Sequence, residues 1–274
     1  MLKKAIKSLK KSYTLHAHEL PMVQLHDRTA LKVWHNSLIP PVVYQTWQDN
    51  LFGKTHYAEI EKFRNLNSEL NFKLFDDKQV DLYMEEYWGN HAIGEIYKQG
   101  KYGPLKSDIF RYCILCERGG LYFDNNKGCN VALSSLCSHG ASGFISYEAN
   151  DSMILPPVRH ISKILYPNKY ILQWGLGFQK NHKILRRMID NICEYYPFFK
   201  NTVFENPSHA IVSFTGPGMF TRTIWELMDE VDELNVDQLG IDFNRHGDYA
   251  FKGSWVRYLK APSYADARNS IIVT

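Results

Sequence analysis

Long apolar segments are missing from this sequence of 274 residues. It contains no run of roughly 18 apolar residues, which excludes a transmembrane helix, and no uninterrupted apolar stretch near its start that would form a secretory signal. The motifs G-x-S-x-G, G-x-x-x-x-G-K and H-E-x-x-H are absent as well, which argues against hydrolase, kinase and zinc-protease chemistry. The sequence therefore predicts a cytoplasmic protein of another class.

Net charge and cysteine are also scarce. A formal net charge of +3 is too small for a dedicated nucleic-acid binder, so we expect no nucleic-acid partner. The five cysteines are an odd number without regular spacing, which indicates a reduced compartment rather than a disulfide framework. Cys113 and Cys116 form C-x-x-C, but no second Cys or His pair follows at zinc-site spacing. We expect both thiols to be small core side chains.

Aromatic residues, in contrast, are abundant at 14% of the chain. Most of them would fill the core, and some could stack on flat ligands. The length suits one substantial core. We therefore expect a single domain over residues 37–274, preceded by a basic segment over residues 1–36.

The first eleven residues have the pattern of a short interfacial helix. Apolar side chains recur at helical spacing, and five lysines occupy other positions of the segment: Lys3, Lys4, Lys7, Lys10 and Lys11. Each lysine near an anionic lipid surface contributes roughly 1 kcal/mol of attraction. The pattern predicts a protein held peripherally at an anionic membrane surface; a solvated basic tail is the alternative.

Strand and helix patterns alternate along the first half of the chain. Val42, Val43 and Tyr44 are bounded by prolines and indicate a buried strand, and residues 71–75 indicate another. Helical patterns cover residues 56–66 and 77–88, and a further helix opens at Pro104, ends at Gly119-Gly120 and is followed by a strand over residues 121–123. This order predicts an α/β fold with a mostly parallel sheet covered by helices. The second half is less regular, with helices expected over 182–195 and 217–228 and loops at 215–218 and 252–255.

Asp108 and Arg111 form the first candidate site. They lie three residues apart on the predicted helix, so both side chains project from one face. A carboxylate accepts and a guanidinium donates, and together they can grip the hydroxyls of a sugar ring. An exposed ion pair at this spacing is common and contributes only ~0.3 kcal/mol, so the pair alone is a weak indicator.

The second candidate site follows the next predicted strand. Asp124 and Asn126 are two residues apart, so on a strand both would face the same way at the edge where α/β proteins bind ligands. Two oxygen ligands placed like this can hold a divalent cation against a diphosphate. Asp-Asn-Asn-Lys-Gly is also an ordinary turn sequence, which is the alternative interpretation.

Four blocks, in order, resemble glycosyltransferase family 32, which has a DXD motif in its sugar-binding region. They cover residues 39–47, residues 72–77, residues 107–112 continuing through 119–124, and residues 253–255. The resemblance implies a Rossmann-like GT-A fold, a nucleotide-sugar donor, Mn²⁺ or Mg²⁺, and transfer of a hexose with retention of configuration. It also implies a glycan or glycolipid acceptor, by family analogy lipopolysaccharide or capsule. The second half, residues 151–274, would then form a helical and loop-rich acceptor side, and residues 37–150 the nucleotide-sugar side.

The resemblance also implies roles for individual residues. Asp108 and Arg111 would hold the donor sugar, and Gln173 would lie near the reacting sugar, where the family usually has Asn. The nucleotide would be bound by residues from three blocks, with Trp47 near the nucleobase and a closing loop over the diphosphate: Tyr44, Trp47, Asp124, Lys252, Ser254 and Trp255.

Two departures from the family pattern concern the metal. Asn126 stands where the family has a second Asp, and a neutral amide adds no charge for binding a cation. The histidines that the family places before Gly-Ser-Trp are replaced by Tyr249 and Ala250. His246 could supply the missing ligand, and Lys252 could instead neutralise the diphosphate as a point charge. We therefore expect a low-affinity cation site; a non-catalytic nucleotide-sugar-binding or scaffold protein with a decayed site is the alternative.

Overall fold

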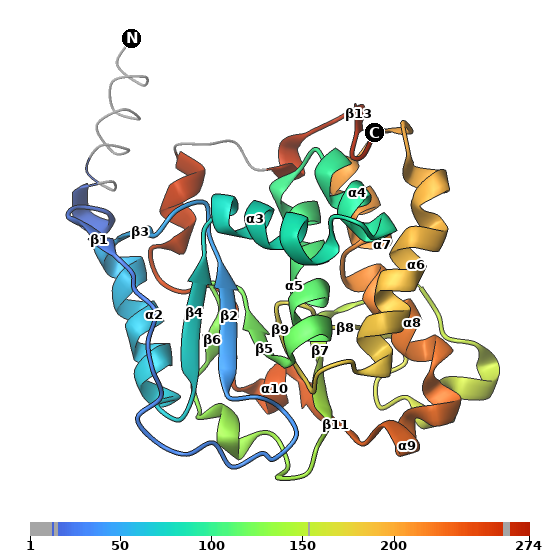
Figure 1. Ribbon diagram of the computed structural model, residues 1–274, viewed down its shortest axis with the longest axis horizontal. Coiled ribbons are helices and arrows are strands. Elements are labelled where there is room, and N and C mark those ends of the chain that lie inside the picture. The colour runs from blue at the N-terminus through green and yellow to red at the C-terminus, as the bar shows by residue number, and fades with distance from the viewer. Residues whose placement is uncertain (1–12, 14–15, 153, 260–263) are drawn as a thin grey trace.

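A computed structural model describes residues 13, 16–152, 154–259 and 264–274 (Figure 1). The predicted interfacial helix at residues 1–11 lies outside these residues. Within them, no helix has both the length and the apolar character needed to cross a membrane.

A seven-stranded sheet forms the centre of the fold. Its strand order is β11-β7-β9-β5-β2-β4, with β8 paired to β7. Strand β2 runs parallel to β4 and β5, and β11 runs parallel to β7, whereas β9 is antiparallel to both β5 and β7. The mostly parallel sheet confirms the predicted fold class. The strands are β2 (Val42–Thr46), β4 (Asn71–Phe75), β5 (Gly120–Phe123), β7 (Gly143–Asp151), β8 (Lys169–Ile171), β9 (Gly175–Phe178) and β11 (Val236–Ile241).

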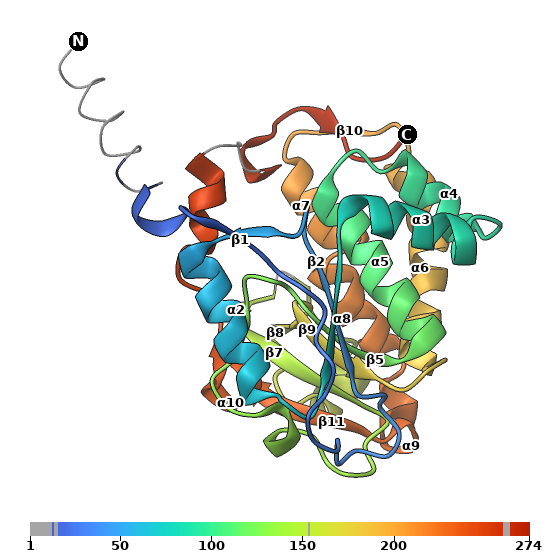
Figure 2. The same ribbon diagram turned by 60° about the vertical axis from the view of Figure 1, so that its left-hand side comes forward.

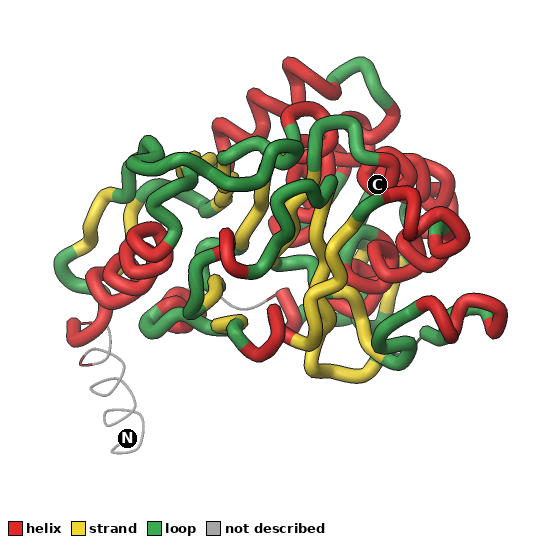
Figure 3. Tube along the Cα trace, turned by 90° about the horizontal axis from the view of Figure 1, so that it is seen from below, coloured by secondary structure: helices red, strands yellow, loops and turns green. Residues whose placement is uncertain are grey.

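Helices cover both faces of this sheet (Figures 1 and 2). One face carries α2 (Lys54–Leu66). The other carries a larger group of helices, so the strands lie between two helical layers (Figure 3). This group comprises α3 (Asp77–Trp88), α4 (Ala92–Gln99), α5 (Gly103–Arg118), α6 (Lys183–Phe199), α7 (Pro207–Phe214) and α8 (Pro217–Glu226).

Short elements complete the fold. Three antiparallel strand pairs are β1 (Met22–Gln24) with β3 (Leu51–Gly53), β6 (Gly128–Cys129) with β12 (Gly247–Asp248), and β10 (Val203–Phe204) with β13 (Ser270–Ile271). The remaining helical turns are α9 (Val231–Leu234), α10 (Asp242–Arg245), η1 (Leu133–Ser135), η2 (Val158–Lys163), η3 (Met228–Glu230), η4 (Ser254–Leu259) and η5 (Tyr264–Asp266).

Two hydrophobic clusters, one on each face of the sheet, form the core. Side chains on a strand alternate between faces, so Val43 joins the cluster beneath α2 while Tyr44 joins the cluster beneath α3 and α5. Cys113 and Cys116 are free and buried in the second cluster, as the sequence predicted. Both halves of the chain contribute strands to the same sheet, because β7, β9 and β11 extend the sheet that β2, β4 and β5 begin.

The predicted elements of the first half are confirmed as β2, α2, β4, α3, α5 and β5. Gly119 and Gly120 end α5 with φ of 68° and 107°, in a region that favours glycine. A Cβ at Gly119 would lie 2.6 Å from the backbone N of Lys180. This close approach lets β5 begin directly after α5.

Helix α5 is buried around more of its circumference than an exposed Asp108–Arg111 pair would require. Ten of its residues are buried, and Asp108 and Arg111 are among them. Because α5 lies beneath other helices and against the sheet, its polar pair faces an enclosed region instead of solvent. A buried ion pair has different energetics from the exposed pair considered above.

Candidate active site

A cleft of about 830 Å³ lies at the carboxyl ends of β2 and β5. In α/β sheets this edge is where ligands bind. The cleft is lined by the residues that follow these two strands, by the first residues of α5 and α8, by the segment before β9 and by the loop at 253–256. Segments far apart in the sequence therefore meet at one edge of the sheet.

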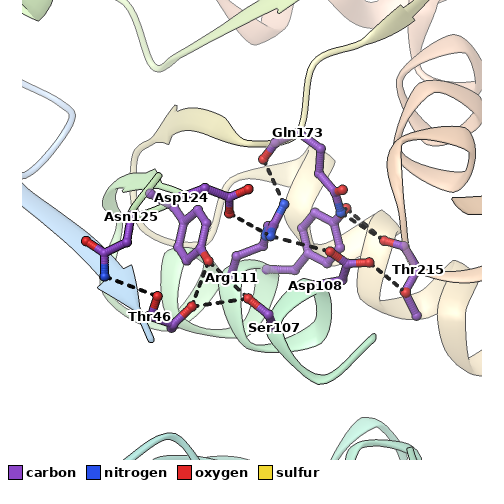
Figure 4. A network of polar contacts seen from close by, with 10 residues as sticks. Thr46, Ser107, Asp108, Arg111, Asp124, Asn125, Gln173 and Thr215 are labelled. Carbon is purple, nitrogen blue, oxygen red and sulfur yellow. Dashed lines mark hydrogen bonds and ion pairs between the residues drawn. The ribbon is translucent and has the colours of Figure 1, made fainter. Parts of the chain in front are cut away.

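Arg111 is the centre of the cleft floor (Figure 4). Its Nη2 lies 3.1 Å from Oδ1 of Asp124 and 3.4 Å from Oδ1 of Asp108, and its Nη1 donates to the backbone O of Gln173 at 3.0 Å. The guanidinium carbon lies 4.6 Å from the ring centroid of Tyr122. One buried cation therefore joins the two carboxylates that the sequence analysis singled out separately.

Burial shapes the electrostatics of this triad. It raises the pKa of Asp108 to about 6, although Arg111 and the hydrogen bond from Thr215 act in the opposite direction. Burial alone would lower the pKa of Arg111, but Tyr122, Asp124 and Asp108 raise it above its ordinary value. Arg111 is thus a permanent cation, while Asp108 changes charge near neutral pH.

Thr215, between α7 and α8, fixes the other side of Asp108. Its Oγ1 donates to Oδ2 of Asp108 at 2.9 Å. Its backbone O accepts from Oη of Tyr112 and from Nε2 of Gln173, both at 3.0 Å, and Nε2 of Gln173 also contacts Oη of Tyr112. These bonds hold Gln173 and Asp108 together in one buried network.

A second network anchors the turn that carries Asp124. Thr46 at the end of β2 shares its hydroxyl with Ser107 at 3.2 Å and with Tyr122 at 3.0 Å. The backbone O of Thr46 accepts from Nδ2 of Asn125 at 3.2 Å, and Nε2 of His56 lies 2.9 Å from the backbone O of Asn125. The turn at 124–127 is therefore fixed to both β2 and α2.

Aromatic residues form the end of the cleft beside β2. Trp47 is half-buried and stacks on Phe52 with ring centroids 5.4 Å apart, and His56 packs edge-on against both rings. This arrangement suits a flat ligand. Tyr44, in contrast, does not line the cleft: it is buried against Phe75, and burial raises its pKa to about 12. Strand alternation directs Tyr44 into the core, so the structure does not support a binding role for it.

The prediction that Asp124 and Asn126 share one face of a strand is wrong. Strand β5 ends at Phe123, and the next four residues form a turn in which the backbone N of Lys127 donates to the O of Asp124 at 3.0 Å. Both side chains nevertheless line the cleft, together with Lys127. The turn, not strand alternation, brings them there.

The donor set fits only a weakly held divalent cation. Oδ1 of Asp124 is paired with Arg111, and Asn126 offers a neutral oxygen. Within the described residues, no three His, Cys, Asp or Glu side chains are grouped closely enough to hold a metal. Magnesium is often held by one or two carboxylates plus substrate phosphates, which this set would allow. His246 does not line the cleft; its Nδ1 lies 3.0 Å from Oδ1 of Asn130, and its neighbour β12 pairs with β6.

The Gly-Ser-Trp loop reaches the cleft through Gly253 and Ser254. Gly253 has a φ of 85°, and a Cβ there would lie 3.0 Å from Cβ of Thr55 and 3.1 Å from the N of His56. Only glycine fits this approach. Trp255 is 46% exposed, with its ring 5.9 Å from that of His18. Lys252 is exposed and does not line the cleft, so the structure does not bring this predicted cation to the site.

Sequence reasoning missed several residues of the cleft. Lys127 lay inside the quoted turn, and its position next to Asn126 could have indicated it. Glu148 stands in no recognisable motif, and neither does Thr215, which bonds to Asp108 from outside the cleft lining; only the fold brings them to this edge. His18 and Glu19, before β1, and Met22, its first residue, also contribute to the cleft wall.

Known proteins share the fold of this chain and the sequence of its first half. The fold is similar to that of the solved structure of the PaToxG glycosyltransferase, with a TM-score of 0.51 and 16% sequence identity over 84% of this chain and 80% of that one. Residues 22–142 match the family described as the glycosyltransferase sugar-binding region containing a DXD motif. This match confirms the resemblance seen in the first three sequence blocks, which lie within residues 22–142.

Curated relatives are similar over a larger part of the chain. An initiation-specific alpha-1,6-mannosyltransferase of Candida albicans is 24% identical over 218 residues, covering 70% of this chain and 54% of the relative. An inositol phosphoceramide mannosyltransferase 3 of Schizosaccharomyces pombe is 24% identical over 190 residues, covering 69% and 46%. The chain thus spans about half the length of these relatives.

Proposed function

We propose that this protein is a glycosyltransferase that moves a hexose from a nucleotide sugar to a glycan or glycolipid acceptor, with retention of configuration. The observation that carries the proposal is the pairing of Arg111 with both Asp108 and Asp124 on the floor of the cleft. The family match at residues 22–142 supports it. The names of the relatives make mannose the first sugar to test.

Different residues of the cleft bind different parts of the donor. Asp108 accepts from the sugar hydroxyls while Thr215 and Arg111 hold its carboxylate in place. Gln173 orients the reacting sugar from the same network. Trp47 stacks on the nucleobase, and Asp124, Ser254 and Trp255 contact the nucleotide. Positive charge near the leaving diphosphate lowers the barrier, because negative charge develops there as the glycosidic bond breaks.

A divalent cation, Mn²⁺ or Mg²⁺, would be held by Asp124 and Asn126 with the help of the diphosphate. When bound it would neutralise the leaving group. We propose low affinity, because only one protein carboxylate contributes charge. Lys127 lines the cleft on the same turn and supplies a fixed positive charge in the position we had expected Lys252 to take.

The acceptor and the location of the protein are proposed on separate grounds. A lipopolysaccharide or capsule acceptor comes from family analogy alone, whereas the relatives above are mannosyltransferases of yeasts. Peripheral attachment to an anionic membrane on the cytoplasmic side rests on the lysines of residues 1–11. We propose residues 37–150 as the nucleotide-sugar side and 151–274 as the acceptor side, with strands from both in one sheet.

The proposal is tested by release of nucleoside diphosphate from a panel of nucleotide sugars with Mn²⁺ present. Wild type should turn over one donor, and Asp124→Ala should lower the rate by about 10²–10³-fold, because it removes a partner of Arg111 and the charged cation ligand. Asp190→Ala, on the exposed side of α6, is the matched control and should behave as wild type. Asn126→Asp should lower the Mn²⁺ concentration needed for half-maximal rate.

The competing function is a non-catalytic nucleotide-sugar-binding or scaffold protein. The observation that favours it is the neutral Asn126 together with the lack of a third ligand among the described residues. Tight binding of a nucleotide sugar without turnover of any donor, unchanged by Asp124→Ala, would establish that function and refute the enzyme.

A further inference from the structure

Glu148, near the end of β7, is a carboxylate of the cleft that the roles above leave unused. It lines the cleft from the carboxyl edge of the sheet, as Asp124 does from β5. The segment before β9 lies between them. The N of Asp124 donates to the O of Trp174 at 2.9 Å, and the N of Leu172 donates to the O of Ser146 at 2.8 Å. Glu148 and Asp124 thus flank the segment that carries Gln173.

The order of the strands in the sheet determines the order in which the residues are arranged along the cleft. Trp47 follows β2, Asp124 follows its neighbour β5, Gln173 and Trp174 precede β9, and Glu148 lies on β7. Neighbouring strands are about 4.8 Å apart, and β9 lies between β5 and β7. Strand β7, which carries Glu148, therefore lies roughly 10 Å from β5, measured across the sheet. A donor with its base at Trp47 and its diphosphate at Asp124 has its sugar pointing along this line. The space beyond the sugar is where an acceptor must enter.

The surroundings of Glu148 indicate a group kept available for a ligand. Among the described residues, none forms a hydrogen bond or ion pair with its carboxylate, although the side chain is half-buried. Burial raises its pKa, while the positive charge of Lys127 acts in the opposite direction. Lys127 itself is held over the ring of Trp174, with Nζ 5.4 Å from the centroid. Asp242, the other charged neighbour, raises the pKa.

Asp108 and Asp124, two other carboxylates that line the cleft, already have partners within the protein. Asp108 uses one oxygen for Thr215 and the other for Arg111, and Asp124 is paired with Arg111. The half-buried carboxylate of Glu148 has no such partner among the described residues and is available to accept from a hydrogen-bond donor on a ligand. The hydroxyls of an acceptor sugar are donors of this kind.

Resting on the proposed function, we infer that Glu148 is the acceptor-binding carboxylate of the cleft, which accepts a hydrogen bond from a hydroxyl of a sugar acceptor. Lys127 also lines the cleft, on the turn that carries Asp124. The substrate class is accordingly an acceptor with a free sugar hydroxyl near the attacking one.

The test compares glycosyl transfer with donor hydrolysis in Glu148→Gln, which keeps the size of the side chain and removes its charge. The probes are the donor turned over by wild type, a panel of methyl hexopyranosides as acceptors, and UDP and GDP for binding. The ratio of transfer to hydrolysis should fall about 30-fold, the loss expected for one hydrogen bond to a charged group, while the affinity for UDP or GDP changes less than about twofold. Asp151→Asn, on the exposed end of the same strand, should keep the wild-type ratio.

Two outcomes would overturn the inference. An unchanged transfer-to-hydrolysis ratio in Glu148→Gln would remove Glu148 from the acceptor site, and an equal loss of transfer and of UDP or GDP affinity would place it in the donor site. Glu148→Asp, compared by the same ratio, covers the case in which the glutamine variant does not fold. Absence of turnover by the wild-type protein would contradict the proposed function itself.

Discussion

The side of the cleft that we propose for the donor and the side that we propose for the acceptor are built in different ways. The donor side comes from short continuous stretches, such as residues 107–111 and 124–127, which carry several functional side chains each. The acceptor side is assembled from single residues that are far apart in sequence: Glu148 on β7 and Gln173 before β9 line the cleft, and the buried Thr215 before α8 accepts from Gln173.

This difference has a topological cause. The donor side uses the ends of two neighbouring parallel strands, β2 and β5, so each strand delivers the residues that follow it. Beyond β5 the antiparallel strand β9 intervenes, and it delivers the residues that precede it. Functional residues in one continuous stretch form a motif that is visible in the sequence. Single residues that are far apart in the sequence become neighbours only in the fold.

The largest expected effect is that of Arg111→Ala, since Arg111 joins the two sides. Its removal leaves Asp108 and Asp124 facing each other without compensation, and we expect a loss of about 3–5 kcal/mol in the free energy of unfolding. Urea denaturation measures this loss. Arg187→Ala, at an exposed ion pair with Glu226, should cost less than about 1 kcal/mol. Equal losses in the two variants would show that the buried network does not stabilise the fold.

Thr215→Val breaks the link between the two sides while keeping the shape of the residue. It removes the donor to Asp108 but leaves the backbone O that Gln173 and Tyr112 use. We expect the rate of donor turnover to fall about tenfold, because a hydrogen bond to a charged group is lost. Thr215→Ser should restore most of the rate. A serine variant as slow as the valine variant would point to packing instead.

The pH dependence of donor turnover sharpens the role of Asp108. The ionised form accepts from the sugar, and burial raises its pKa to about 6, so activity should decline as pH falls through this value. At one pH unit below it, turnover should be about a tenth of the plateau. The effect on stability has the opposite sign, because a raised pKa favours proton binding by the folded state and this group stabilises the fold as pH falls. A pH–rate profile of wild type and Asp108→Asn checks the assignment. The residual activity of the variant should not show the decline at low pH that wild type shows.

The smallest effect is expected for Lys252→Gln. Lys252 is exposed and outside the cleft, whereas Lys127 lines it. We expect the affinity for UDP or GDP to change by less than about twofold in Lys252→Gln and to fall by about tenfold in Lys127→Gln. A charge close to the diphosphate attracts it more strongly than a distant charge that is screened by solvent and salt. Calorimetry would measure both. A larger loss in Lys252→Gln would restore the role that the sequence suggested.

Much of the fold could be predicted because its signals are local. Strand β4 and helix α3 begin and end as their patterns indicated, and Asp76 forms the capping box that starts α3. Helix α4 was missed, since eight residues between His91 and Gly100 give too short a pattern. Helix α7 is equally short. The turn at 124–127 was mistaken for a strand end because turn and strand sequences overlap there.

The candidate site was predictable only in part, for reasons of the same kind. Asp108, Arg111 and Asp124 lie in continuous blocks and meet in the cleft. Tyr44 lies in such a block too, but strand alternation buries it in the core. Lys252 and His246 were chosen by nearness in sequence to the loop, and the fold turns both away from the cleft. Nearness along the chain was thus a good guide within one turn or helix and a poor one across a loop.

The close packing of Gly253 limits how the Gly-Ser-Trp loop can move. The N of Phe251 donates to the O of Asn126 at 2.8 Å, and Gly253 is pressed against the start of α2. The first half of the loop is consequently part of the rigid body that contains the turn at 124–127. Trp255 follows this fixed stretch; its ring is 46% exposed and lies 5.9 Å from that of His18, in the segment before β1. Rotation of the Trp255 side chain therefore requires no displacement of the backbone at Gly253 or of the turn at 124–127.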